Sequence, residues 1–226
     1  MNARDSAFWA GMRTVLFDID GTLLDAGGAG RAAFGAALEV ATGSAEGLET
    51  ISFAGSTDAR VLAEMEALHR RVYGEGERGE FWRRFAEELR ERLAAKPARQ
   101  VAGAEAFVRR LKSRGVRCGL LTGNFEGGAR IKLESAGMGG LFEFGGYGDV
   151  HCDRADIARD ALAAARAAGA DISEAAVCVV GDTPLDVAGG LAVGLPVWGI
   201  AAGRFTPEAL LAAGASGAWR NWRDGA

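Results

Sequence analysis

The chain contains four short runs of apolar residues, each followed by a turn and then by a helical pattern. The runs cover residues 14–17, 116–121, 176–180 and 196–200. All four are continuously or almost continuously apolar, which is typical of strands in a parallel sheet covered on both faces. Helical patterns lie at 104–114, 127–136, 154–168, 185–192 and 207–213, and a weaker strand pattern lies within 142–147. This alternation predicts an α/β fold with a Rossmann-like, doubly wound parallel sheet.

The stretch from residue 26 to residue 96 breaks this alternation, because its patterns are only helical (31–41, 58–73 and 80–95). In the last of them Phe81, Phe85, Leu89 and Leu93 recur on one face of a helix. We therefore expect a core domain of residues 1–25 and 97–226 and an inserted α-helical cap domain of residues 26–96. The glycine-rich residues 27–30 are expected to form a hinge, and residues 74–77 a mobile loop inside the cap.

Polar residues and glycines gather at the ends of three predicted strands. The segments are Asp18-Ile19-Asp20-Gly21-Thr22, Thr122-Gly123-Asn124 and Gly181-Asp182-Thr183-Pro184-Leu185-Asp186. In open α/β sheets, ligands bind beyond the carboxyl ends of the strands. Turn formation could account for one such cluster. Three clusters at the same edge of the sheet predict a binding site.

Several carboxylates in one small site repel one another, so a cation is needed to keep them ionised. Oxygen ligands favour a hard metal, and a site with room for water and phosphate favours Mg²⁺. Asp18 could then attack phosphorus as a nucleophile and form an aspartyl-phosphate. Asp20 could act as general acid and base. The hydroxyl group of Thr122 and the N–H groups of the next turn could hold phosphate oxygens.

Three of these segments carry a resemblance to a known family. DIDGTLL (18–24), LLTGN (120–124) and VVGDTPLD (179–186) resemble motifs one, two and four of the haloacid dehalogenase-like hydrolase superfamily, in the same order and with matching spacing. The resemblance covers essentially the whole chain. The helical insertion after motif one is similar to the small cap of the branch that includes phosphoglycolate phosphatases and β-phosphoglucomutases.

The resemblance implies a role for each matching residue. Asp18 would be the nucleophile and a metal ligand, and Asp20 would be the acid/base and bind the metal through its carbonyl oxygen. Asp182 would be the metal carboxylate, and Asp186 an additional or supporting ligand. The phosphate-binding turn would comprise Thr122, Gly123 and Asn124. Dehalogenases of this superfamily lack an acid at the position of Asp20 and phosphonatases carry alanine there, so Asp20 implies phosphate-ester chemistry.

The match to motif three, usually a lysine that neutralises the nucleophile and the phosphate, is imperfect. Lys132 follows Thr122 by only ten residues and lies within a predicted helix, where we expect it to face outward. Arg154 begins a predicted helix 28 residues before Asp182. Arginine can bind a phosphate through two N–H groups. We therefore assign the motif-three role to Arg154.

Other interpretations need no active site. Asp20 could belong to a plain turn, and Asp182 or Asp186 could cap the helix that follows. Arg154 could be an ordinary surface charge. Residues 53–58 resemble a segment that this branch often places near its substrate, but Thr57 or Asp58 could equally be the N-cap of the next helix.

The composition excludes several other classes. The formal net charge of −4 argues against a general nucleic-acid surface. No apolar run approaches the roughly 20 residues of a membrane helix, and the N-terminus lacks the apolar core of a signal peptide. The three cysteines form no C-x-x-C pair, and the two histidines, His69 and His151, give little support for a metal site, although His151 could approach the pocket. We expect a cytoplasmic monomer or weak homodimer without nucleic-acid or membrane partners.

These observations favour a Mg²⁺-dependent phosphatase that acts on a small phosphorylated metabolite, such as a phosphoglycolate-like compound or a sugar phosphate. One alternative is a phosphomutase of the β-phosphoglucomutase kind, which would use the same aspartates. The other is a non-catalytic phosphoacceptor module that senses phosphate. Such modules also gather aspartates at strand ends, but they are usually about half this length and carry no helical cap.

Overall fold

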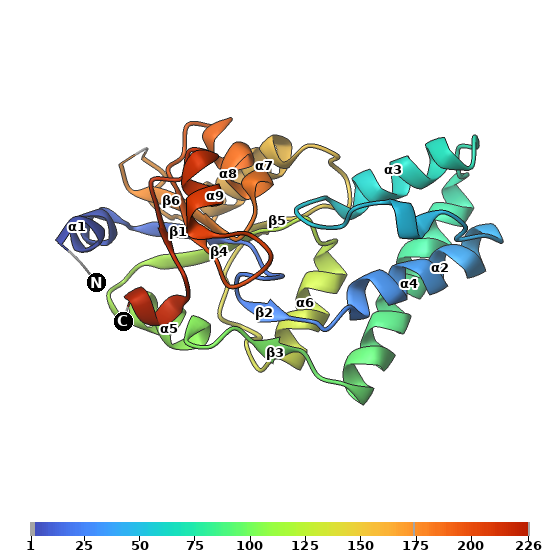
Figure 1. The fold of residues 1–226 in the computed structure, drawn as a ribbon, viewed down its shortest axis with the longest axis horizontal. Coiled ribbons are helices and arrows are strands. Elements are labelled where there is room, and N and C mark those ends of the chain that lie inside the picture. Colours follow the sequence, from blue (N-terminus) through green and yellow to red (C-terminus); the bar gives the residue numbers. More distant parts are fainter. Residues whose placement is uncertain (1–2, 174, 226) are drawn as a thin grey trace.

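The computed structural model describes residues 3–173 and 175–225, which form a six-stranded parallel sheet with helices on both faces (Figure 1). The strand order is β5-β4-β1-β6-β7-β8, and every neighbouring pair is parallel. The strands are β1 (Thr14–Phe17), β4 (Arg117–Leu121), β5 (Gly145–Gly146), β6 (Val177–Gly181), β7 (Val197–Ile200) and β8 (Gly217–Trp219). The predicted doubly wound α/β fold is therefore confirmed.

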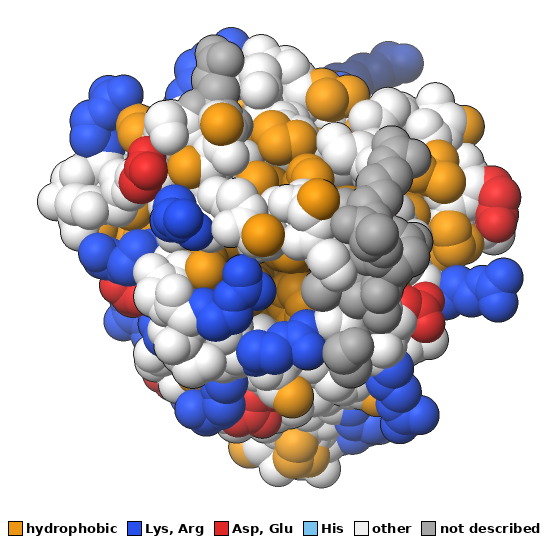
Figure 2. Space-filling model, turned by 90° about the vertical axis from the view of Figure 1, so that its left-hand side faces the viewer, with side chains coloured by type: hydrophobic (Ala, Val, Ile, Leu, Met, Phe, Trp, Pro, Cys, Tyr) orange, Lys and Arg blue, Asp and Glu red, His pale blue; other side chains and the backbone are white. Residues whose placement is uncertain are grey.

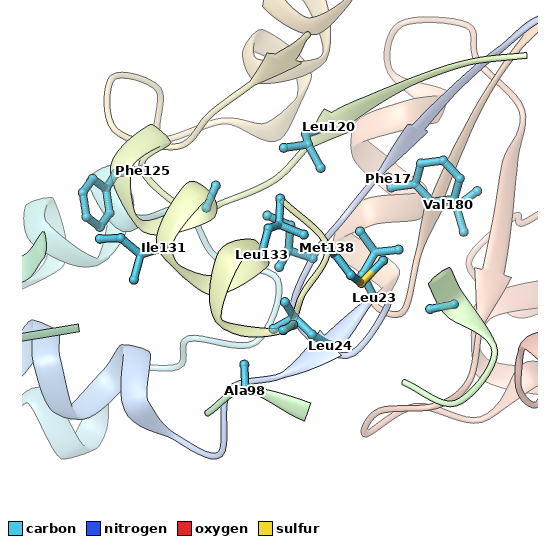
Figure 3. Packing of buried hydrophobic residues seen from close by; sticks show 14 of the residues in the cluster. Phe17, Leu23, Leu24, Ala98, Leu120, Phe125, Ile131, Leu133, Met138 and Val180 are labelled. Carbon is cyan, nitrogen blue, oxygen red and sulfur yellow. The ribbon is translucent and has the colours of Figure 1, made fainter. Parts of the chain in front are cut away.

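Helices cover the sheet because both of its faces are apolar. One face carries α7 (Arg154–Ala167), α8 (Pro184–Leu191) and α9 (Pro207–Ala212) (Figure 1). The other carries α5 (Ala104–Ser113) and α6 (Glu126–Ser135). Leu133 of α6 packs near Leu24, Leu120 and Met138, and Phe125 and Ile131 lie on the opposite side of the helix (Figure 3). All four residues of β1 are buried, which matches its unbroken apolar sequence.

Strand β1 lies between β4 and β6, where the chain reverses its direction across the sheet. The connection from β1 leads to β4 on one side, and the connection through α7 returns to β6 on the other. Such a switch point leaves a crevice at the carboxyl ends of the strands. Asp18, directly after β1, therefore lies at the crevice.

The segment between β1 and β4 holds a group of helices at one end of the molecule (Figure 1). These are α2 (Ala29–Thr42), α3 (Asp58–Leu68) and α4 (Glu75–Ala95), with a short 3₁₀ turn at Leu48–Thr50. Helices α2 and α4 pack closely, and Phe34 meets Phe81 with 4.7 Å between ring centroids. The chain leaves and returns through an antiparallel pair, β2 (Leu24–Asp25) and β3 (Arg99–Gln100). Gly27 and Gly28, at the exit, have φ angles of 59° and 83° that favour glycine.

Two expectations for this segment were wrong. Residues 75–77 are not loop, because α4 already begins at Glu75; the Gly74 N–H donates to Glu77 Oε2 at 2.8 Å and stabilises the first turn. The helix predicted over 58–73 ends at Leu68, and Arg70 follows with a φ of 51°. The predicted helix was too long because Tyr73, which lies beyond the end of α3, is buried in the same core as the apolar residues of α3.

Helix α1 (Ala3–Gly11) and the C-terminal strand β8 were not expected from the sequence, and both contribute to a cluster of aromatic rings. Trp9 stacks on Trp219 with centroids 5.4 Å apart, and Trp198 packs against both. The indole N–H of Trp222 donates to the carbonyl oxygen of Thr22 at 2.8 Å, which ties the C-terminal region to the loop after β1. Figure 2 shows the outer face at this end, where Lys and Arg side chains predominate over Asp and Glu.

Within the described ranges, none of the helices combines the length and the apolar character that a membrane crossing requires.

Candidate active site

Three carboxylates meet where β1 and β6 end. Asp18 follows β1, and Asp182 and Asp186 follow β6. Each offers an oxygen such that all three atoms lie within 4.8 Å of one another, and all three residues are buried. Asp18 lies 164 positions before Asp182 in the sequence, and the pairing of β1 with β6 brings the two together.

The loops around this acidic cluster have shapes that few residues permit. Gly21 has a φ of +80°, and a Cβ there would collide with the carboxylate of Asp182. Thr183 is the N-cap of α8, and its hydroxyl accepts from the Asp186 N–H at 3.2 Å while Pro184 occupies the first turn. Asp186 Oδ2 accepts from the N–H (2.9 Å) and the hydroxyl (2.7 Å) of Thr183. The capping interpretation therefore holds for Asp186, whereas Thr183 and not Asp182 is the N-cap.

Arg154 carries positive charge into the acidic cluster. It is the first residue of α7, which Asp153 caps by accepting from the Ala155 N–H at 2.9 Å. Its guanidinium donates to Asp18 Oδ1 at 3.2 Å and also to Asp186 Oδ1. Only 7% of the residue is exposed, so Arg154 is not an ordinary surface charge.

The carboxylates remain short of positive charge despite Arg154. Burial raises the pKa of Asp182 far above its ordinary value, and repulsion from Asp186 and Asp18 adds to the effect. Burial, and then repulsion from Asp186, also raise the pKa of Asp18, although Arg154 opposes this. These buried carboxylates offer only oxygen ligands, and their raised pKa values mean that they are not readily ionised together. A hard divalent cation fits such a site, because its charge would balance theirs.

The predicted phosphate turn lies beside this cluster, between β4 and α6. The Thr122 hydroxyl accepts from Asn124 Nδ2 at 2.8 Å and is fully buried. Gly123 and Asn124 line the cavity in front of Asp18. A Cβ at Gly123 would collide with the carbonyl oxygen of Ser56, so glycine is required where residues 53–58 approach the turn.

Lys132 does not face outward as expected, and that prediction was wrong. Its side chain is 6% exposed, and its Nζ lies 2.6 Å from Asp20 Oδ2 and 2.5 Å from Asn124 Oδ1. The signal was in the sequence: apolar Ala129 and Ala136 lie one turn before and after it on the same helix face. Lys132 and Arg154 thus both lie in the site, each beside a different aspartate.

A cavity of about 350 Å³ lies over the acidic cluster. The helical segment contributes Phe53, Gly55, Asp58 and Phe85 to its wall. The loop after β7 contributes residues that sequence reasoning missed, Arg204 and Phe205. That loop shows no motif, so only the fold places it at the mouth of the cavity.

Residues 53–58 include the N-cap of α3, and most of them line the cavity. Thr57 is the N-cap of α3 and accepts from the Arg60 N–H at 3.0 Å. Asp58 makes two hydrogen bonds to the turn after β4. Its N–H donates to the Gly123 carbonyl, and its Oδ2 accepts from the Phe125 N–H, both at 2.8 Å. The start of α3 is therefore hydrogen-bonded to the turn after β4.

Replacement of Asp58 by asparagine should flatten the pH dependence of stability. Burial raises the pKa of Asp58 from 3.8 to about 7, although Lys132 and the Phe125 N–H lower it. When folding raises the pKa of a carboxyl group, the free energy of unfolding is highest below the pKa of the unfolded chain. It falls as the pH rises toward the folded pKa, here about 7, and is constant above it. Between about pH 5.5 and about pH 8.5, urea denaturation should show wild type losing about 2 kcal/mol relative to Asp58→Asn.

The matched control is Asp156→Asn, at a half-exposed carboxyl that pairs with Arg159. It should retain the wild-type pH dependence. An Asp58→Asn profile parallel to that of wild type would contradict the prediction.

The histidines and cysteines lie away from this cavity. His151 Nε2 lies 2.8 Å from Asp160 Oδ2 and does not line the cavity, so it does not approach the pocket. His69 contacts the Glu46 carbonyl in the helical segment. The three cysteines are free, and burial raises the pKa of the Cys118 thiol to about 12.

Comparisons with known proteins agree with the fold. A family model of haloacid dehalogenase-like hydrolases matches residues 12–194. A search of curated proteins finds no match.

Three solved structures illustrate the structural similarity. CbbY from Rhodobacter sphaeroides, solved with phosphate, has a TM-score of 0.70 at 16% identity, covering 93% of this chain and 95% of its own. A protein from Bacteroides vulgatus, provisionally assigned as a β-phosphoglucomutase, scores 0.69 at 21% identity, covering 98% and 91%. A protein from Haemophilus somnus, assigned by prediction as a phosphoglycolate phosphatase, scores 0.68 at 17%, covering 95% and 96%.

Two of these neighbours carry assignments as a β-phosphoglucomutase and a phosphoglycolate phosphatase, the branch that the helical insertion suggested. The match to the family model extends over most of the chain and includes Asp18, Asp20, Asp182 and Asp186. The chain belongs to the haloacid dehalogenase-like hydrolases.

Proposed function

We propose that the protein is a Mg²⁺-dependent phosphatase that hydrolyses a small phosphorylated metabolite through an aspartyl-phosphate on Asp18. The observation that carries the proposal is the pair of aspartates at the end of the central strand. Asp18 is buried and hydrogen-bonded to Arg154, while Asp20 is more exposed and lines the cavity. The two carboxylates therefore have different surroundings, as a nucleophile and a proton carrier require.

In the first step a carboxylate oxygen of Asp18 attacks the phosphorus of the substrate. The new bond joins that oxygen to phosphorus, and the bond from phosphorus to the leaving oxygen breaks. Asp20, in its protonated form, gives its proton to the leaving oxygen, which departs as an alcohol. The guanidinium of Arg154, which donates to Asp18 Oδ1, can also bind oxygens of the phosphoryl group.

In the second step water attacks the aspartyl-phosphate. Asp20, now a carboxylate, takes a proton from the water as its oxygen bonds to phosphorus, and the bond between phosphorus and Asp18 breaks. Inorganic phosphate leaves, and Asp18 and Asp20 return to their starting states. One residue thus acts as acid in the first step and base in the second.

Asp18, Asp182 and the carbonyl oxygen of Asp20 would hold the cation. When bound, Mg²⁺ supplies positive charge that offsets the carboxylates and the phosphoryl oxygens. Asp186 has both oxygens engaged, Oδ2 by Thr183 and Oδ1 by Arg154, which supports a role in orienting Arg154.

The cavity supports a small substrate. Its volume of about 350 Å³ and its roof of residues from the helical segment leave little room for a polymer. If residues 26–96 act as a cap that closes over the site, water and bulky esters would be excluded together. A phosphoglycolate-like compound or a sugar phosphate would fit such a site.

Removal of the metal tests the proposal directly. With Mg²⁺ the purified protein should release inorganic phosphate from para-nitrophenyl phosphate, and chelation followed by dialysis should lower this rate by at least about 100-fold. Re-addition of Mg²⁺ should restore it. A protein that hydrolyses no phosphate ester with Mg²⁺ present would refute the proposal.

The same assay, extended to a panel of phosphorylated metabolites, would identify the substrate class. It also separates the alternatives: a mutase would return the phosphoryl group to a sugar with little phosphate release, and a sensing module would accumulate a stable aspartyl-phosphate.

A further inference from the structure

Lys132 is a buried lysine whose ammonium group contacts the candidate active site rather than solvent. Its Nζ lies 2.6 Å from Asp20 Oδ2 and 2.5 Å from Asn124 Oδ1. Asn124 Nδ2 in turn donates to the same oxygen of Asp20 at 2.8 Å. The three side chains form a closed hydrogen-bonded triangle, which we call the Lys132 triangle.

The Lys132 triangle restricts the carboxylate of Asp20. Its Oδ2 accepts two hydrogen bonds, from Lys132 and from Asn124. Across residues 3–173 and 175–225, no bond to its Oδ1 is found, and Asp20 lines the cavity. One oxygen of this cavity-lining carboxylate is therefore held by two donors, and the other has no protein partner among the described residues.

Packing alone does not explain a lysine at this position. The neighbouring buried positions of α6, Ala129, Ile131 and Leu133, are apolar. A buried ammonium group is costly unless it is paired and hydrogen-bonded, and an apolar side chain of similar length would avoid that cost. The ammonium group does have partners here, and both belong to residues of the candidate site.

The position of Lys132 also limits what can lie beside it. A Cβ on Gly30, in the first turn of α2, would lie 3.2 Å from Nζ. The positive charge of Lys132 also lowers the pKa of Asp58, though burial raises it more. The ammonium group thus lies where α2, α3, the phosphate turn and the loop after β1 meet.

We propose that Lys132 is a positioning residue that holds Asp20 in place for proton transfer. This inference rests on the proposed phosphatase function. It assigns each of the two buried basic side chains, Arg154 and Lys132, to a different aspartate. Arg154 contacts the nucleophile Asp18, and Lys132, which also lines the cavity, acts through the acid/base Asp20 that it holds. Asn124 joins the Lys132 triangle to the turn after β4, because it belongs to that turn and donates to Asp20.

The test is a double-mutant cycle between Lys132 and Asp20, measured as kcat and KM for para-nitrophenyl phosphate with saturating Mg²⁺. Lys132→Met keeps the length of the side chain and removes the charge. It should lower kcat about 10- to 100-fold with KM changed less than about threefold. In the Asp20→Asn background the same substitution should lower kcat less than about twofold, because the group that it positions is already lost.

Two further variants complete the experiment. Lys132→Arg keeps the charge and should recover part of the lost kcat, although its planar guanidinium fits the triangle less well. Lys132→Gln replaces Lys132→Met in the cycle if the latter does not fold. Lys112→Met is the matched control, since Lys112 also bonds to a carboxylate, Glu143 at 2.8 Å, but lies away from the cavity; it should keep the wild-type kcat.

Equal losses of kcat in both backgrounds would overturn the inference and make the effect structural. A raised KM with unchanged kcat would also overturn it, by assigning Lys132 to substrate binding. If the wild type is active and Lys132→Met is fully active too, the role of Lys132 is refuted but the proposed phosphatase function is not. A wild type without phosphatase activity would instead refute the proposed function, and the inference with it.

Discussion

Asp18→Asn should abolish phosphate release, with kcat lowered by more than about 10⁴-fold. Asparagine has nearly the same shape as aspartate, but its neutral amide is not a nucleophile toward phosphorus. The substitution also removes one carboxylate from a crowded cluster in which burial and repulsion from Asp186 raise the pKa of Asp18. In the absence of metal at about pH 8 we therefore expect the variant to be at least as stable as wild type. Steady-state kinetics and thermal unfolding of the same preparation measure both effects.

Loss of activity without loss of stability separates chemistry from misfolding. Asp156→Asn is a suitable control, because Asp156 is a carboxylate that pairs with Arg159 on α7 and does not line the cavity. It should keep a kcat within about threefold of wild type. Substantial turnover by Asp18→Asn would exclude the aspartyl-phosphate mechanism.

Arg154→Met should destabilise the metal-free protein and lower its activity. Arg154 is the buried cation that contacts Asp18 and Asp186, and its removal would leave those carboxylates without an internal counter-charge. Breaking a buried ion pair from one side typically costs about 3–5 kcal/mol. The loss of a donor near the phosphoryl group should lower kcat by about 10²- to 10³-fold. Urea denaturation with and without Mg²⁺, together with kinetics, checks both.

Mg²⁺ should restore more stability to Arg154→Met than it adds to wild type, since the cation would replace part of the missing charge. Arg159→Met, one turn and a half further along α7 and exposed, serves as the control and should behave as wild type. Equal Mg²⁺ stabilisation of Arg154→Met and wild type would show that the metal and the guanidinium do not share the same carboxylates.

The core strands could be predicted well because their signal is local. Strand β1 coincides with the run 14–17, and β4, β6 and β7 each begin one residue after the start of their predicted run. Strand β8 could not be found in this way. The strand Gly217–Trp219 is only three residues long, too short to give a pattern, and its extended form depends on pairing with β7. A short edge strand is specified by its neighbour more than by its own residues.

The site was predictable only in part, for a similar reason. Motifs at strand ends located the carboxylates, since parallel strands bring their carboxyl ends to one edge. Which basic side chain pairs with which carboxylate depends on the direction of side chains that lie far apart in the sequence. Lys132 and Asp20 are 112 residues apart, so the apolar neighbours of Lys132 on α6 indicate that it points inward, but only the folded packing shows which aspartate it meets. The Arg204 loop carries no pattern that would place it at the cavity.

The placement of the five tryptophans gives this protein two separable optical signals. Trp9, Trp198, Trp219 and Trp222 lie within one network of ring contacts beside α1, where the stacked pair Trp9 and Trp219 should couple electronically in the near ultraviolet. Trp82 of α4 instead packs on Phe125, 5.4 Å away, at the junction of the helical segment with α6. Movement of that segment would change the emission of Trp82 and leave the circular dichroism of the coupled pair untouched. Any movement of that segment over the cavity would therefore be detectable without an added label.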